Sequence, residues 1–462
     1  MDLVMGVDSS TQSTKVEVRR HDDGGLVATG RGAHPPTTPP QSEQDPAAWV
    51  TALLEATAQC GEQCSLSDVV AISVAGQQHG LVVLGDDDEP LRPAKLWNDT
   101  ESAAEAEALV REAGAHFWAD ACGSVPVAAF TITKLAWLAA HEPDVFDRVR
   151  RVMLPHDYLT WWLSAAFVTD RGDASGTGWW SPKDEAWNTD LLDRVAPAQW
   201  SDRLPRILGP SEPAGRLSGD RAAALGLDDS VVVGPGTGDN MAAALGLGLT
   251  PGDLALSFGT SGTAYAVSAT PTADPTGAVA GFADATGNFL PLVCTLNAMK
   301  VTDTVSTLLG VDHEQFDELA RAGRPGGDGL TLVPYFDGER TPNRPDATGS
   351  LVGLRTDVGR EDLARAAVEG VVCGLLEGVD ALHAAGVDTA SGRTVMIGGG
   401  TRSAAYRHTV ADLLQRPIVV PDADELVALG ACVQAAAVHA GADPAKITGA
   451  WSVGAGTEIE PT

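Results

Sequence analysis

The stretch GVDSSTQSTK, residues 6–15, has a counterpart half a chain later in LSFGTSGT, residues 256–263. Each contains a turn that follows an apolar, strand-like run and leads directly into another such run rather than into a helix. Turns built from Gly, Ser and Thr expose backbone N–H groups and hydroxyls, which suit phosphate oxygens. Two such turns that face each other would hold a triphosphate from both sides.

Strand-like and helix-like runs alternate in both halves of the chain, which predicts an α/β fold. Buried strands are expected at 69–74, 231–233 and 394–397, and helices at 46–59, 361–385, 403–415 and 426–439. Residues 170–190, where glycines stand among tryptophans, are predicted to be a loop region. The repeated turns indicate a duplicated unit, so we expect two domains, residues 1–245 and 246–462, with a cleft between them.

Composition excludes several classes of partner. The 462 residues carry 62 acidic and 31 basic side chains, a formal net charge of −31. This charge repels nucleic acid and anionic membranes, so we expect neither as a partner. The chain contains no Gly-Lys dipeptide and no Gly-x-Gly-x-x-Gly sequence, so neither a P-loop nor a dinucleotide-binding motif is present.

Cysteine spacing and hydropathy predict a cytoplasmic protein. The six cysteines are scattered and form no zinc-binding set, which favours reduced thiols. No apolar run reaches the roughly 18–20 residues that a membrane span requires, and the N-terminus lacks the cationic start of a signal peptide.

Two aspartates stand beside Gly-rich or hydroxyl-rich turns. Asp8 ends the apolar run before the first turn, and a carboxylate that faces phosphates needs a cation between them, so Asp8 is a candidate Mg²⁺ ligand, through water. Asp239 follows three alternating glycines and precedes an Ala-rich helix. It could cap that helix, or accept the proton of a hydroxyl that attacks a phosphoryl group. Because a helix N-terminus stabilises an anion, we expect a low pKa for Asp239.

Two further loops offer groups for ligands. The loop Gln77–Gly80 presents amide and imidazole groups that suit sugar hydroxyls, although a histidine in a loop is more often structural. Gly398–Gly400 lies between a buried strand and a helix. Bare backbone there would let an adenosine approach closely, or would simply form a flexible turn.

Taken together, these segments resemble the FGGY family of carbohydrate kinases, which includes glycerol kinase, gluconokinase, ribulokinase and xylulokinase and has the ATPase fold of actin, hexokinase and Hsp70. The similarity is greatest to the xylulokinase group. Beyond the two turns and residues 397–403, the resembling stretches follow the family's order and cover most of the chain: residues 75–80, 91–99, 130–137, 154–159, 169–177 and 338–343.

The resemblance implies two ribonuclease-H-like domains with a deep interdomain cleft, ATP and Mg²⁺, and phosphorylation of D-xylulose at O5. It places the catalytic proton acceptor at Asp239. The sugar contacts are expected at Gln78, His79, Asp239 and Asn240. The nucleotide is expected at Thr11, Gln12, Ser13, Gly259 and Thr260 for its phosphates, and at Gly399, Gly400 and Ser403 for its adenosine, with the metal at Asp8.

Alternatives stay open at this point. In the loop Gln77–Gly80, called the sugar loop below, xylulokinases often carry Met before the His, and here Gln78 replaces it. A kinase for another ketose, polyol or aldonate, such as ribulose or gluconate, is therefore the alternative. The Arg-Glu pair that glycerol kinases carry in this loop is absent, which argues against glycerol. A non-catalytic, nucleotide-gated module is a third reading. The last predicted helix ends soon after residue 440, and a homodimer is left open.

Overall fold

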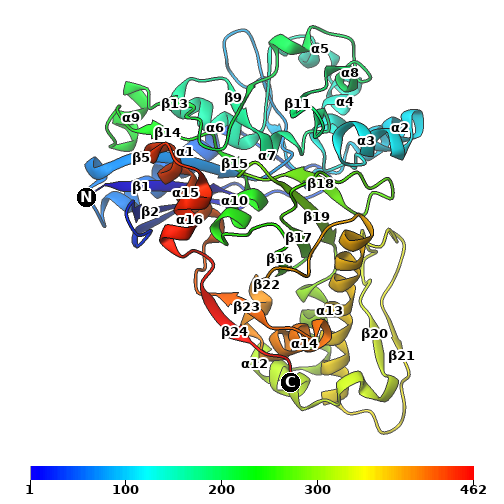
Figure 1. Ribbon diagram of the computed structural model, residues 1–462. Helices are drawn as coiled ribbons and strands as arrows, with labels where there is room; N and C mark the ends of the chain where they lie inside the picture. Colours follow the sequence, from blue (N-terminus) through cyan, green and yellow to red (C-terminus); the bar gives the residue numbers. More distant parts are fainter. Residues whose placement is uncertain (1) are drawn as a thin grey trace.

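The computed structural model describes residues 2–462 and contains two seven-stranded mixed β-sheets, each covered by helices, in two lobes that lie one above the other in Figure 1, together with smaller two-stranded sheets. The first sheet has the strand order β13-β14-β5-β1-β2-β3. Its strands are β1 (Leu3–Ser9), β2 (Ser13–Arg20), β3 (Leu26–Ala33), β5 (Val69–Gly76), β13 (Gly215–Arg216), β14 (Val232–Val233) and β15 (Thr237–Gly238), the last pairing with β5 outside this order. β1 is antiparallel to β2 and parallel to β5, so it is the strand at which the direction of pairing changes.

The second sheet repeats this arrangement, with the order β18-β19-β17-β16-β22-β23-β24. Its strands are β16 (Leu254–Phe258), β17 (Gly262–Ala266), β18 (Ala280–Ala283), β19 (Phe289–Thr295), β22 (Thr394–Ile397), β23 (Ile418–Pro421) and β24 (Gly456–Ile459). Like β1, β16 is antiparallel to the next strand and parallel to a later one. The duplicated unit predicted from the two turns is therefore present, and the fold is the expected α/β type.

Helices cover both sheets. The helix predicted at 46–59 is α1 (Pro46–Gly61), which Asp45 caps by accepting from Ala47 N and which has Pro46 at its first position. The second lobe holds α11 (Met299–Leu309), α12 (His313–Ala322), α13 (Arg360–Ala384) and α14 (Ala404–Leu414). The first lobe is extended by α2 (Ala103–Ala113), α3 (Ala115–Cys122), α4 (Thr131–His141), α5 (Pro143–Phe146), α6 (Pro155–Ser164), α8 (Thr189–Leu192) and α9 (Gly219–Leu225).

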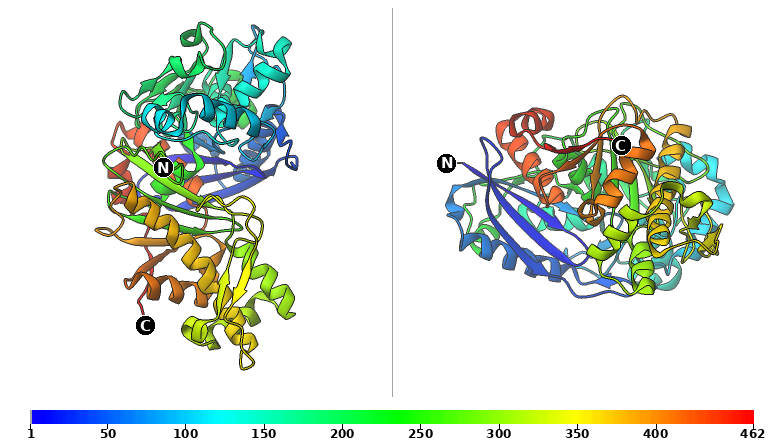
Figure 2. Two further views of the ribbon diagram at one scale, coloured as in Figure 1. Left: turned by 90° about the vertical axis from the view of Figure 1, so that its right-hand side faces the viewer. Right: turned by 90° about the horizontal axis from the view of Figure 1, so that it is seen from below.

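The chain returns to the first lobe near its end. α15 (Leu426–Ala440) packs against β1, β5 and α10 (Asp239–Gly246), as the red helix beside the blue strands in Figures 1 and 2 shows. Gly6 makes this approach possible, because a Cβ there would lie 2.2 Å from the carbonyl oxygen of Ala428. The expectation that helical structure ends soon after residue 440 is wrong, since α16 (Pro444–Trp451) and β24 follow.

The region 170–190 is more regular than the predicted loop. It contains the end of β9 (Val168–Asp170), then α7 (Arg171–Ala174), β10 (Trp180–Ser181) and β11 (Ala186–Trp187). The Asp170 carboxylate starts α7 by accepting hydrogen bonds from Gly172 N at 2.8 Å and Asp173 N at 2.9 Å. The glycines of this region favour a loop, but the Asp170 carboxylate accepts hydrogen bonds from the first backbone N–H groups and so stabilises a helical turn.

Across the described residues, no helix by itself has the length and apolarity to cross a membrane; only α15 and α16 taken together, with a bend of 117° between them, meet that test.

Candidate functional site

The first turn joins β1 and β2, whose register pairs Asp8 with Lys15 and Ser9 with Thr14. Asp8 is only 3% exposed. Its carboxylate accepts a hydrogen bond from Ser10 Oγ and lies 3.8 Å from Lys15 Nζ. Burial raises its pKa, against the opposing effects of Ser10 and Lys15. The Asp8 carboxylate is therefore poorly hydrated and lies next to the Ser10 hydroxyl of the turn.

Thr11 links the first turn to the sugar loop. Its hydroxyl donates to Gln77 Oε1 at 3.1 Å and accepts from Trp97 Nε1 at 2.9 Å. Gln12 is exposed at the tip, whereas Ser13 is buried. The Thr11 hydroxyl therefore already has two protein partners. The accessible polar groups at the tip of the first turn are thus those of the backbone.

The second turn, between β16 and β17, is braced by the start of α11. The carbonyl of Gly259 accepts from Met299 N at 2.9 Å, and the carbonyl of Thr260 accepts from Ala298 N at 3.3 Å. Thr260 itself is exposed. Because the carbonyls face the helix, the turn is fixed in place while its hydroxyl side remains open.

Asp239 is the first residue of α10, and Gly238 is the N-cap. β15 (Thr237–Gly238) pairs with the end of β5, so Asp239 emerges beside the sugar loop. One oxygen of its carboxylate accepts from Asn240 N at 2.8 Å and from Asn240 Nδ2 at 3.0 Å.

The expected low pKa of Asp239 is wrong. Burial, followed by the charges of Asp8 and Asp173, raises its pKa to about 7, and the hydrogen bond from Asn240 N only partly opposes this. Loss of hydration and two neighbouring carboxylates therefore outweigh the helix N-terminus. The group is consequently poised to accept a proton near neutral pH.

The sugar loop lies against Asn240. Gln78 Oε1 accepts a hydrogen bond from Asn240 Nδ2 at 2.8 Å, and Gln78 is 4% exposed. Gln78 Nε2 is buried and has no partner among the described residues. An amide donor left unpaired in this position is available to a ligand oxygen.

His79 is held in one orientation. Its backbone has a φ of 65°, and its ring stacks on Phe130 at 4.9 Å and lies 5.5 Å from Phe282 of β18. Burial, followed by the charge of Lys134, lowers its pKa to about 3, so the ring is neutral. Since Nδ1 lies 2.8 Å from the carbonyl of Gly176, Nδ1 carries the proton and donates. Nε2 is therefore the acceptor.

Sequence reasoning missed a cluster of buried titratable groups behind this loop. His156 Nδ1 lies 2.7 Å from Asp173 Oδ2, and its Nε2 lies 3.1 Å from Asp157 Oδ1 and 3.7 Å from Asp170 Oδ1. Despite burial, these carboxylates raise the pKa of His156 to about 9, so it is a buried cation. Asp170 also accepts from Thr237 Oγ1 at 2.7 Å, two residues before Asp239. The signal was present as charged residues within 154–159 and 169–177.

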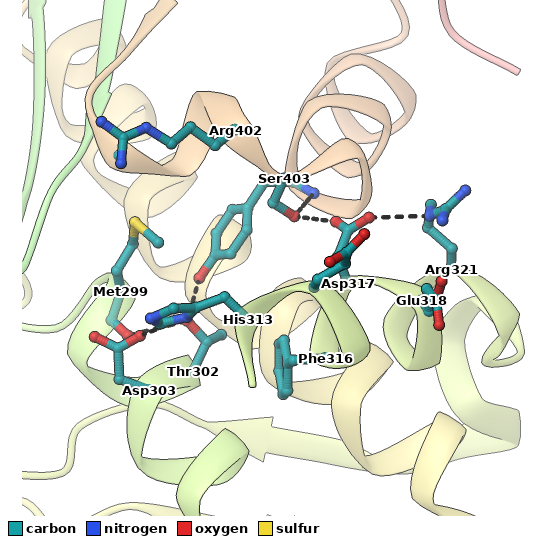
Figure 3. Close-up of a pocket in the computed structure, with 13 residues that line it drawn as sticks. Met299, Thr302, Asp303, His313, Phe316, Asp317, Glu318, Arg321, Arg402 and Ser403 are labelled. Atoms are coloured by element: carbon teal, nitrogen blue, oxygen red, sulfur yellow. Dashed lines mark hydrogen bonds and ion pairs between the residues drawn. The ribbon is translucent and has the colours of Figure 1, made fainter. Parts of the chain in front are cut away.

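A pocket of about 530 Å³ lies between α11, α12 and the start of α14 (Figure 3). Gly399 and Ser403 line it, but Gly400 does not: Gly400 is buried, and a Cβ there would lie 2.6 Å from Phe258 Cβ. Ser403 Oγ donates to Asp317 Oδ1 at 2.5 Å, which fixes the rim. The size suits a ligand such as a nucleoside.

One acidic group elsewhere has metal-like spacing: Glu43, Asp99 and Glu101. Lys95 Nζ lies among them, 3.0, 3.2 and 2.5 Å from their carboxylates. The buried ammonium, together with Arg92, which lies 2.6 Å from Glu43 Oε1, offsets most of the negative charge, so the cluster is a structural ion-pair network.

Residues 3–246 match the N-terminal domain of the FGGY family of carbohydrate kinases, and residues 254–439 match its C-terminal domain. The chain is 49% identical to a xylulose kinase of Streptomyces coelicolor, over 99% of this chain and 92% of the relative. It is 35% identical to a xylulose kinase of Haemophilus influenzae, over 94% and 90%. A crystal structure of xylulose kinase from Bifidobacterium adolescentis superimposes with a TM-score of 0.87 at 38% identity, covering 98% of this chain and 99% of that one.

Proposed function

Because the chain belongs to the FGGY family of carbohydrate kinases, we propose that it transfers the γ-phosphoryl group of ATP to O5 of D-xylulose, giving D-xylulose 5-phosphate and ADP. The observation that carries the choice of sugar is the 49% identity to a xylulose kinase along almost the whole length of both chains.

Asp239 is the proposed proton acceptor. As the bond between O5 and the γ-phosphorus forms, the bond from that phosphorus to the bridging oxygen of ADP breaks, and the O5 proton passes to the Asp239 carboxylate. A base with a pKa of about 7 is half deprotonated at neutral pH and still accepts a proton readily. In a loose transition state the attacking hydroxyl need not lose its proton early, so the proton transfer to Asp239 occurs late in the reaction.

The sugar is proposed to lie against Gln78, His79, Asp239 and Asn240. The unpaired Gln78 amide donates to one hydroxyl oxygen, and the unprotonated Nε2 of His79 accepts from another hydroxyl. Asn240 holds both Gln78 and Asp239, so one side chain aligns the sugar-binding amide with the base.

ATP is proposed to place its phosphates between Thr11–Ser13 and Gly259–Thr260, and its adenosine in the pocket lined by Gly399 and Ser403. Asp8 fits Mg²⁺, because a buried carboxylate whose pKa is raised by loss of hydration gains from a hard cation nearby. When bound, the metal would neutralise phosphate charge that Asp8 and Asp239 otherwise repel.

We propose that the chain divides into two domains between residues 245 and 246, and that α15, although it lies in the second domain's sequence, packs on the first lobe.

We also propose that the protein acts in the cytoplasm. Six free cysteines and an ATP requirement favour that location.

A substrate panel tests this function. Purified protein with ATP and Mg²⁺ should phosphorylate D-xylulose with a higher kcat/KM than ribulose, gluconate or glycerol, measured by coupled ADP formation and identification of the sugar phosphate. Gln78→Met serves as the matched variant and should alter the ranking of the sugars rather than abolish transfer, because only one hydroxyl contact changes. A higher kcat/KM with gluconate or ribulose would replace xylulose as the substrate, and no transfer to any sugar would refute the kinase assignment.

A further inference from the structure

The buried carboxylate of Glu339 fixes the turn Gly338–Arg340. It bonds to the chain segment that also supports the turn between β16 and β17, called the phosphate turn below. Glu339 is 3% exposed. Its Oε1 accepts from Leu296 N at 2.6 Å and from Arg340 N at 2.8 Å, and its Oε2 accepts from Asn297 Nδ2 at 2.9 Å. A buried carboxylate with this many donors fixes the backbone of Arg340.

This clamp sets the position of Arg340 relative to the phosphate turn. Leu296 follows Thr295, the last residue of β19, and Thr295 pairs with Gly262 at the base of the turn. Two residues further on, Ala298 N donates to the carbonyl of Thr260. The same short segment therefore carries both the brace of the phosphate turn and the anchor of Arg340.

The side chain of Arg340 has no protein partner. Within residues 2–462 its guanidinium donates no hydrogen bond and forms no ion pair, although the side chain is only partly exposed. Arginine presents a planar set of donors that matches phosphate oxygens.

The charge of Arg340 affects the pKa of two groups, one in the sugar loop and one on β19. Burial, Lys134 and, more weakly, Arg340 lower the pKa of His79 in the sugar loop. Burial raises the pKa of the Cys294 thiol on β19, the charge of Arg340 opposes that shift, and the charge of Asp239 adds to it. Arg340 is therefore close enough to His79 of the sugar loop and to Cys294 of β19 for its charge to act on both.

We propose that Arg340 is a catalytic residue, which binds the equatorial oxygens of the phosphoryl group while it moves from ATP to the sugar. This inference rests on the proposed kinase function and adds to it a cation from the second lobe. Charge on the transferring group is spread over its outer oxygens, and a fixed guanidinium stabilises it without rearrangement.

Kinetics of Arg340→Gln test the proposal. We expect kcat to fall by about 10²- to 10³-fold, with the sugar KM changed only slightly, because the lost contact forms in the transition state. Arg340→Lys should retain part of the activity, since it keeps the charge but not the planar donors. Arg344→Gln makes the same charge change at an exposed position of the same loop and should leave kcat unaltered.

A second measurement tests the placement without any turnover. Removing the Arg340 charge should raise the thiol pKa of Cys294 and slow its alkylation at fixed pH, whereas labelling of the exposed Cys373 serves as an internal reference. A kcat of Arg340→Gln within about twofold of the unsubstituted enzyme would overturn the catalytic role, as would a loss confined to the KM for ATP. If no sugar is phosphorylated at all, the function fails, and unchanged Cys294 labelling in Arg340→Gln would separately refute the placement.

Discussion

At the scale of single residues, the chemistry depends on how the surroundings of Asp239 set its affinity for a proton. The helix N-terminus and the Asn240 donors favour the carboxylate, whereas burial, Asp8 and Asp173 favour the acid, and the second group prevails.

This balance predicts a pH dependence. Only the deprotonated Asp239 accepts the O5 proton, so kcat/KM for the sugar should fall as the pH drops below about 7, approaching tenfold per pH unit. Initial rates in buffers of constant ionic strength check this. An acidic limb centred near the ordinary pKa of an aspartate would contradict the raised pKa.

The same shift bears on stability. A carboxyl whose folded-state pKa lies above its unfolded value stabilises the fold at low pH, and this contribution is lost as the pH rises through about 7. Asp239→Asn removes the buried charge, so its gain in Tm over the unsubstituted protein should grow from about pH 5 to about pH 8. A constant or shrinking difference in thermal unfolding would argue against a buried charge at this position.

Sequence reasoning identified which side chains lie together better than it identified their states. Glycine-rich and polar motifs mark where strands end, and the structure joins Asp239, Asn240 and Gln78 by hydrogen bonds, while their roles toward a ligand stay predictions. The raised pKa of Asp239 could not be predicted, since dehydration and the charge of Asp173 depend on neighbours far away in the chain. Gly400 was assigned to the nucleotide on its local pattern, yet its missing side chain makes room for Phe258.

At the scale of elements, β15 and α7 fix the position of Asp239. Thr237 on β15 donates to Asp170, the cap of α7, and α7 also carries Asp173, which is bonded to the buried His156. The strands and long helices were predictable from their periodic patterns. The α7 turn was not, because a four-residue helix stabilised by one capping carboxylate leaves no periodic signal.

Thr237→Val tests this connection. The substitution keeps the shape but removes a buried donor from Asp170, so we expect a loss of about 1–3 kcal/mol in the free energy of unfolding, together with a fall in kcat as Asp239 loses its alignment. Thr237→Ser retains the hydroxyl and should behave like the unsubstituted enzyme. Urea unfolding with steady-state kinetics measures both effects, and a Thr237→Val protein with unchanged kcat would show that the strand is held by other contacts.

At the scale of the whole molecule, the two large sheets repeat one pattern of strand pairing, and each carries a turn rich in Gly, Ser and Thr after its first strand. This arrangement could be foreseen from the repeated sequence pattern, but the return of α15 to the first lobe could not, because a buried, uniformly apolar helix does not reveal which sheet it covers. With a net charge of −31, long-range attraction contributes nothing to binding of ATP, so under the proposed function the local N–H groups and the metal provide it.

The most direct test of the central claim is single-turnover phosphoryl transfer by Asp239→Asn with ATP, Mg²⁺ and D-xylulose. The account predicts that the variant still binds the sugar, while the rate of D-xylulose 5-phosphate formation falls by at least about 10²-fold, as expected when a general base is lost. A rate close to that of the unsubstituted enzyme, with sugar binding intact, would contradict it.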